Sequence, residues 1–173
     1  MDAADENFMR LAIQKAKEGV DKGQTPFGCC IVKDNEVISC EHNRVWETTD
    51  ITAHAEVTAI RVACKKLNSI DLSGCVIYST TEPCPMCYSA IHWAKISKII
   101  FGTRIEDAKD FGFSELCISD KQMKKMGNDC IKIEGDLLRE ENLDLFNYWK
   151  NKDNSRVYYM RDKNYSPSNS TTE

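Results

Sequence analysis

The chain has 173 residues, of which 42% are hydrophobic and 29% are charged, and its formal net charge at pH 7 is −4. This length suits one domain with a sizeable core, and no apolar run approaches the length needed to cross a membrane. The first six residues, Met1 to Glu6, are acidic, whereas a secretory signal begins with basic residues. We therefore expect a cytoplasmic protein with no membrane partner.

The net charge indicates the kind of substrate, and the cysteines indicate the redox state of the thiols. A protein that grips a nucleic acid normally presents a basic face, since neutralising phosphates supplies much of the affinity. The acidic balance favours a small neutral substrate over RNA or DNA, and we assign the lysines between 121 and 125 to the solvated side of a short helix. The nine cysteines are an odd number, and Cys29, Cys30 and Cys75 lie in apolar runs, which predicts reduced, mostly buried thiols.

The first part of the chain predicts one helix and a hairpin. Residues 7–18 carry apolar side chains at helical spacing and are followed by Gly19, which we expect to end the helix. Residues 27–33 and 36–41 are two β-like runs on either side of Asp34-Asn35, a pair that tolerates positive φ angles. The first two strands are therefore predicted to be antiparallel neighbours joined by a tight turn.

The middle of the chain predicts a parallel pair of strands. A helix is expected over 53–67, followed by a strand over 75–80. A helix that ends at Ala94 and an apolar run over 98–102 come next. Strand, helix and strand in this spacing form a crossover unit, which joins parallel strands.

The last part predicts a short helix, a strand and a long helix. A capping box at Ser119 to Gln122 opens a helix that stops at Gly127, and 129–134 and 136–150 supply the strand and the long helix. The sum is an α/β protein, a three-layer α/β/α sandwich with a five-stranded mixed sheet. We expect one domain over residues 1–161, and the polar composition predicts a disordered tail over 162–173.

Two short motifs carry the chemistry. His54-Ala55-Glu56 opens one predicted helix, and Pro83-Cys84-Pro85-Met86-Cys87 opens the next. One imidazole and two thiolates, from His54, Cys84 and Cys87, hold Zn²⁺ with a fourth position open for water, as catalytic zinc sites do. Glu56 lies beside the imidazole and is free to move protons. Together these residues are the signature of a zinc-dependent deaminase that acts on a nucleobase.

Plainer interpretations apply to each motif alone. A Cys-x-x-Cys pair in a cytosolic protein is often a redox pair or part of a closed structural zinc site, and an isolated His-x-Glu is often accidental. A closed site needs a fourth ligand, and the only later cysteines are Cys117 and Cys130. His92 lies inside a predicted helix, where core packing is the ordinary explanation. The joint pattern, with a proline before the first cysteine, favours the catalytic interpretation.

From the first helix to about Tyr158, the chain resembles the cytidine deaminase-like superfamily, and within it most closely the bacterial guanine deaminases. The zinc motifs identify the superfamily, and tRNA adenosine deaminases share them together with Asn43. The matching segments are Pro26-Phe27-Gly28, Asn43, Thr52 to Arg61, Glu82 to Cys87 and Ala90 to Ala94.

The resemblance implies roles for individual residues around the base. Asn43 matches an asparagine that hydrogen-bonds the purine, and Phe27 and Trp93 match aromatic walls of the pocket. In guanine deaminases an acidic residue that follows the fourth strand recognises the N–H donors of the purine. Glu115, in the window Gly112 to Glu115, is the candidate for that role in this chain.

The resemblance also implies Zn²⁺ as the cofactor and hydrolytic deamination of guanine to xanthine and ammonia as the reaction. Glu56 would be the catalytic proton carrier, and the backbone N–H of Ala55 would assist the developing tetrahedral centre. A homodimer is implied in which residues 151–160 cross to the partner and Tyr158, or failing that Tyr159, closes the partner's pocket.

Other functions stay open at this point. They are deamination of the wobble adenosine of tRNA, deamination of guanosine or of a free pyrimidine base, and a non-catalytic zinc fold used for dimerisation. The tRNA function needs basic surface around the pocket, of which the sequence shows little. The intact Glu56 argues against a non-catalytic fold, because a purely structural site has no use for that carboxylate.

Overall fold

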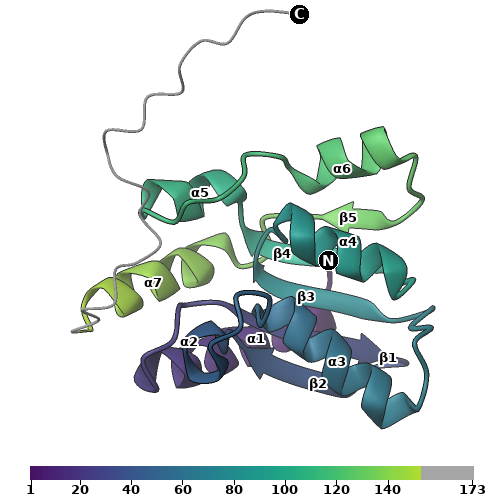
Figure 1. The fold of residues 1–173 in the computed structure, drawn as a ribbon, viewed down its shortest axis with the longest axis horizontal. Helices are drawn as coiled ribbons and strands as arrows, with labels where there is room; N and C mark the ends of the chain where they lie inside the picture. The colour runs from purple at the N-terminus through teal and green to yellow at the C-terminus, as the bar shows by residue number, and fades with distance from the viewer. Residues whose placement is uncertain (153–173) are drawn as a thin grey trace, which may run out of the picture.

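The computed structural model describes residues 1–152, which form one mixed β-sheet (Figure 1). The strands lie in the order β2-β1-β3-β4-β5. β1 is antiparallel to β2 and β3, whereas β4 runs parallel to both β3 and β5. The predicted hairpin and the predicted parallel pair are therefore confirmed. The strands are β1 (Gly28–Lys33), β2 (Glu36–His42), β3 (Val76–Thr81), β4 (Lys98–Thr103) and β5 (Lys132–Glu134).

Helices cover both faces of this sheet (Figure 1). α3 (Ala55–Leu67) and α4 (Pro85–Trp93) cover one face, and α1 (Ala3–Asp21) and α7 (Arg139–Lys150) cover the other. The predicted three-layer α/β/α sandwich is confirmed. None of the helices in the described part of the chain is long and apolar enough to cross a membrane. The remaining helices are α2 (Val45–Thr48), α5 (Ile105–Asp110) and α6 (Asp120–Gly127).

The strands divide their side chains between two cores. In β1, Cys29 and Ile31 pack toward α3 and α4, while Cys30 and Val32 pack toward α1 and α7. This alternation follows from the two-residue period of a strand. Because helices cover both faces of the sheet, the sequences of its strands are nearly continuous apolar runs. Polar side chains gather instead at the carboxyl ends of the strands.

Some predicted boundaries were wrong for physical reasons. α1 continues past Gly19 to Asp21, because this buried glycine serves close packing: a Cβ there would lie 2.8 Å from the side chain of His42. β5 begins at Lys132 because Asp129, three residues earlier, makes a local turn in which its Oδ1 accepts a hydrogen bond from the backbone N–H of Ile131 at 3.1 Å.

The prediction of reduced thiols was wrong for one pair. Cys30 on β1 and Cys40 on β2 are directly opposite each other in the sheet and form a disulfide. A register shift between Ile31 and Val32 produces this pairing. The other cysteines of the described residues are free, and Cys29, Cys75 and Cys87 among them are buried.

Candidate active site

Two helix N-termini bring the predicted metal ligands together. His54 is the N-cap of α3 and Cys84 is the N-cap of α4, and both have extended backbone, with ψ angles of 158° and 164°. Neither side chain caps its own helix, so both remain available to a ligand. Pro85 fixes the first position of α4 without losing a helical hydrogen bond, and Cys87 follows in the first turn.

The spacing of the three ligand atoms fits zinc. His54 Nδ1 lies 3.7 Å from Cys84 Sγ and 3.5 Å from Cys87 Sγ. A tetrahedral ion with Zn–S bonds of about 2.3 Å and Zn–N bonds of about 2.0 Å would separate such atoms by about 3.6 Å. These three residues are the one group within residues 1–152 whose ligand atoms all lie within 4.8 Å of one another. The donor set and its geometry both match a catalytic zinc centre.

The pKa values of the Cys84 and Cys87 thiols depend on their close contact with each other. The hydrogen bond from Cys87, followed by the contact with His54, outweighs burial and lowers the pKa of Cys84 to about 4. The same neighbour, Cys84, together with burial, raises the pKa of Cys87. Zn²⁺ held by these residues would bind both sulfurs as thiolates, because metal ligation requires deprotonated cysteines.

Glu56 is buried beside the ligand group. Its Oε1 accepts a hydrogen bond of 3.0 Å from the Ser79 hydroxyl on β3, and its Oε2 lies 3.4 Å from Cys87 Sγ. Burial raises the pKa of Glu56, which brings the carboxyl closer to the range in which it can both accept and release a proton. The role of Ser79 was not predicted, because it depends on how α3 packs against β3, which short sequence patterns do not show.

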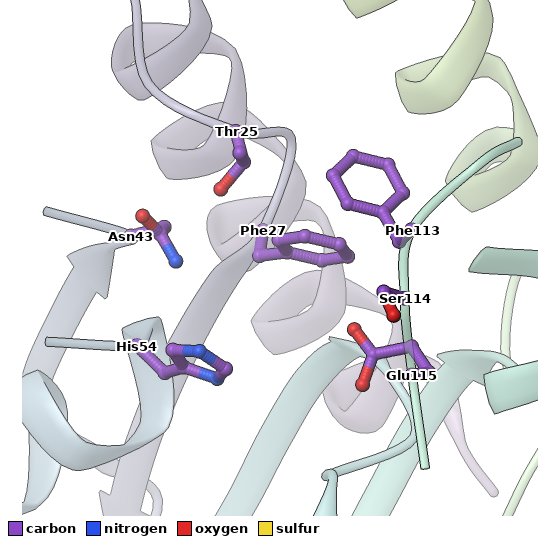
Figure 2. A pocket seen from close by; sticks show the side chains of 7 residues that line it. All are labelled: Thr25, Phe27, Asn43, His54, Phe113, Ser114 and Glu115. Carbon is purple, nitrogen blue, oxygen red and sulfur yellow. The ribbon is translucent and has the colours of Figure 1, made fainter. Parts of the chain in front are cut away.

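A cavity of about 130 Å³ opens beside His54. Figure 2 shows Asn43 on one side of it and Glu115 on the other, with Phe27 between them. These three residues were predicted to contact the substrate, and the fold gathers them around one space next to the ligand group. The complete lining is Thr25, Phe27, Asn43, His54, Phe113, Ser114 and Glu115.

Two polar side chains of the cavity, those of Asn43 and Glu115, have opposite hydrogen-bonding roles. Asn43 is buried, and its Oδ1 accepts from the backbone N–H of Val45 at 3.1 Å, which leaves the side-chain NH₂ as a donor toward the cavity. The Glu115 carboxylate points across the cavity toward His54 (Figure 2). Burial, and after it the Cys84 charge, raises the pKa of Glu115 to about 7. One wall therefore donates, and the opposite wall accepts when Glu115 is ionised.

Aromatic side chains enclose the cavity. Phe27 and Phe113 meet edge to face with ring centroids 4.9 Å apart, and Phe113 also contacts Trp149 of α7 at 4.9 Å. Phe146 packs behind both phenylalanines. The contribution of Phe113 was not predicted as such, although the residue lies in the window that contains Glu115.

Trp93 is a correction. It is the ninth and last residue of α4, and it lies about 12 Å along the helix from the first residue, away from the ligand group. Its side chain is 80% exposed and borders a separate hollow with His92, Met123 and Asp129. His92 was expected to pack in the core, but it is exposed and its Nδ1 pairs with Asp129 at 2.8 Å.

Two further predicted residues complete the account. Ala55 is fully buried as the first residue of α3, where its backbone N–H has no partner within the helix and faces the same end as His54. Tyr158 lies outside the described residues.

Comparison with known proteins agrees with this geometry. The family model for the cytidine and deoxycytidylate deaminase zinc-binding region matches residues 2–103. The guanine deaminase of Bacillus subtilis is 39% identical over 154 residues, which cover 88% of this chain and 98% of that protein. A crystal structure of guanine deaminase from Bacillus subtilis superposes with a TM-score of 0.61 at 37% identity, covering 92% of this chain and 100% of the other.

A second group of relatives is also similar. The tRNA-specific adenosine deaminase of Aquifex aeolicus is 48% identical over 96 residues, which cover 56% of this chain and 64% of that protein. The likeness is thus stronger per residue but is limited to a shorter stretch of this chain. The family match, the fold and the His-Cys-Cys group agree: the chain belongs to the cytidine and deoxycytidylate deaminase family, and it is a zinc-dependent hydrolytic deaminase.

Proposed function

We propose that the protein is a guanine deaminase, which hydrolyses guanine to xanthine and ammonia. The observation that carries the proposal is the cavity beside His54, where the Asn43 amide and the Glu115 carboxylate face each other across a space bounded by phenylalanine rings. The similarity to the guanine deaminase of Bacillus subtilis over 88% of this chain supports the same substrate. We place the enzyme in the cytoplasm as part of this proposal.

Recognition of the base rests on Asn43, Glu115 and Phe27. The Asn43 NH₂ group donates to acceptor atoms of the purine, and the ionised Glu115 accepts from its N–H groups. Phe27 contacts the flat ring system and keeps its plane fixed. Positioning of this kind matters because a displacement of about 1 Å at the reacting centre costs about a hundredfold in rate.

Glu56 moves the protons of the reaction. His54, Cys84 and Cys87 would hold Zn²⁺, which in such sites lowers the pKa of a coordinated water to about 7. Glu56 takes a proton from the attacking water and delivers it to the ring nitrogen beside the attacked carbon. It then carries a second proton to the departing amine, and Ser79 keeps one carboxylate oxygen in place throughout. The N–H of Ala55 assists at the tetrahedral carbon.

The wobble adenosine of tRNA is the second candidate, because tRNA adenosine deaminases match the zinc region. Holding an anticodon loop requires positive surface beside the pocket. None of the residues within 1–152 that line the cavity is a lysine or an arginine, and the formal net charge of the chain is −4. These features support a free base as the substrate ahead of an RNA.

The C-terminal segment belongs to the same proposal. We assign residues 151–160 to a homodimer contact in which Tyr158 closes the partner's cavity; residues 153–160 lie outside the described part of the chain. The contact of Trp149 with Phe113 supports this assignment, since α7 ends beside a wall of the cavity. A closing aromatic lid would exclude water from the reacting groups.

Product analysis tests the function. Purified zinc-loaded protein should release xanthine and ammonia from guanine in equal amounts, and a Glu56→Gln preparation purified in parallel should release both at no more than about 1% of that rate. Xanthine release by the wild type that is no faster than in that control would contradict the proposal.

Mixing two inactive chains tests the assignment of the tail. A Glu56→Gln chain keeps its tail, and a chain truncated after Lys150 keeps its Glu56, so activity should return in heterodimers if the tail acts across the interface. Truncation after Met160 is the matched control and should leave activity intact. Verified heterodimers without activity would contradict the exchange.

A further inference from the structure

Thr25 has a hydroxyl without a partner on the wall of the cavity. The residue is 4% exposed, and its Oγ1 is buried with no hydrogen-bond partner among residues 1–152. Thr25 lines the cavity, and in Figure 2 its hydroxyl points into the space between Asn43 and Phe27. Buried hydroxyls normally find a partner, so an unmet one at a ligand cavity indicates a group that the ligand completes.

The backbone around Thr25 holds this orientation. The Phe27 N–H donates to the carbonyl of Thr25 at 2.8 Å, and Pro26 between them has a fixed φ angle. On the other side, Gln24 Oε1 accepts from the Trp46 N–H at 3.2 Å. These contacts fix the backbone position of Thr25, and its branched Cβ restricts the χ1 angle that sets the direction of the hydroxyl.

Thr25 and Asn43 together form one donor wall. Asn43 Oδ1 already accepts from Val45, so its side chain offers hydrogens to the cavity, and the Thr25 hydroxyl supplies a further hydrogen beside it. Guanine presents two neighbouring acceptors, the keto oxygen O6 and the ring nitrogen N7, along one edge. Adenine presents one acceptor and one donor on the corresponding edge, and therefore matches two donors less well.

We propose that Thr25 is a substrate-binding residue, whose hydroxyl donates a hydrogen bond to the O6/N7 edge of guanine next to the one from Asn43. This inference rests on the proposed guanine deaminase activity and adds a specificity-determining contact to it. The opposite wall, Glu115, then accepts from the N–H groups of the same base.

The test compares Thr25→Val with Thr25→Ser. Valine keeps the shape and removes the hydroxyl, whereas serine keeps the hydroxyl. Thr58→Val is the matched control, because Thr58 is a second threonine with a buried, unpartnered hydroxyl but does not line the cavity. All variants are made in a Glu56→Gln background, in which turnover is too slow to consume the ligand. Calorimetry would then give Kd for guanine, for 2-aminopurine, which lacks O6, and for 7-deazaguanine, which lacks N7, and a thermal melt would give Tm.

We expect Thr25→Val to bind guanine about tenfold more weakly, as the loss of one hydrogen bond to a ligand implies, while Tm is unchanged or higher because an unmet buried hydroxyl is gone. For one of the two analogues the effect of the substitution should vanish, which identifies the acceptor. Thr25→Ser and Thr58→Val should bind guanine like the Glu56→Gln parent.

Three results would overturn the inference: unchanged guanine binding, an equal loss for all three ligands, or a fall in Tm that accounts for the weaker binding. The proposed function is judged separately by wild-type turnover. If wild-type protein deaminates guanine and Thr25→Val binds it normally, only the role of Thr25 fails. If wild-type protein does not act on guanine, the function itself fails.

Discussion

The hydroxyl of Ser79 on β3 donates a 3.0 Å hydrogen bond to Oε1 of Glu56 on α3, and both residues are buried. This bond ties the proton-carrying carboxylate to the sheet that also positions α4 and its cysteines. It favours the ionised form of Glu56, in opposition to the effect of burial, which raises the pKa of that carboxyl. Ser79 is therefore a positioning residue for the proton transfer.

Replacing Ser79 by alanine should lower kcat by at least about tenfold, with KM for guanine little changed, since a hydrogen bond to a charged group contributes about 1.5 to 3 kcal/mol. The pKa of Glu56 should rise, so the acidic limb of the kcat/KM profile moves to higher pH. Ser39→Ala is the matched control, because its buried hydroxyl donates to the Ala59 carbonyl instead. An unmoved acidic limb in Ser79→Ala, or an equal shift in Ser39→Ala, would refute the positioning role.

Zinc content should be close to one ion per chain. Cys84→Ser and Cys87→Ser should both lose the ion and the activity and should melt at lower temperature, because a bound metal stabilises only the folded state. Cys117→Ser changes an exposed cysteine and should match the wild type. A fully active, metal-free protein would overturn the assignment of the site.

Glu56→Gln should keep zinc and should still bind guanine, while kcat falls by a factor of about 10² to 10⁴, as the loss of a general acid–base group implies. The amide has nearly the shape of the carboxyl but cannot carry protons. Metal analysis, calorimetry and steady-state rates on one preparation separate these effects. Near wild-type kcat would remove Glu56 from the mechanism.

The raised pKa of Glu115 predicts that the binding of guanine depends on pH. Its pKa is raised to about 7 by burial and the nearby Cys84 charge, so the carboxylate that accepts from guanine forms as the pH rises through about 7. KM for guanine should therefore fall between about pH 6 and pH 8. Glu115→Gln should bind about tenfold more weakly and lose this dependence. A KM that varies equally in both proteins would contradict the role of Glu115.

The raised pKa of Asp120 predicts that the free energy of unfolding depends on pH. It is completely buried, both carboxyl oxygens lack a partner within residues 1–152, and burial followed by the Glu82 charge raises its pKa from 3.8 to about 9. The folded protein thus holds this proton more tightly than the unfolded chain. Its contribution to stability is complete below about pH 4 and is lost as the pH rises through about 9.

Asp120→Asn should remove that dependence. Above pH 7 the variant should be more stable than the wild type by at least about 1 kcal/mol, and below pH 4 the difference should disappear. Urea unfolding at several pH values gives the measurement. A stability difference that is constant from pH 4 to pH 9 would show that Asp120 does not titrate as inferred.

The zinc group could be predicted from the sequence because local geometry decides it. His54 and Glu56 lie at the start of one helix, and Cys84 and Cys87 lie within one turn of another, so short spacings fix where their side chains point. The order of strands around the crossover brings the two helix N-termini to the same end of the sheet.

The rest of the site depends on long-range register, which short patterns do not contain. A direct count back from the Asp34-Asn35 turn places Cys30 opposite Ser39, and only the shift between Ile31 and Val32 places it opposite Cys40. The contact of Ser79 with Glu56 and the position of Thr25 on the cavity wall also depend on segments that are far apart in the sequence. The prediction that Trp93 forms a wall of the cavity was wrong, because a motif gives the position of a residue along its helix but not the side of the helix on which the cavity lies.

The most direct test of the account compares kcat/KM for ammonia release from guanine, guanosine, adenine, cytosine and a tRNA anticodon stem-loop with a wobble adenosine. Opposed donor and acceptor walls predict that guanine exceeds every other substrate by at least about a hundredfold. Equal or faster deamination of the stem-loop adenosine, or of any of the other three, would contradict the central claim.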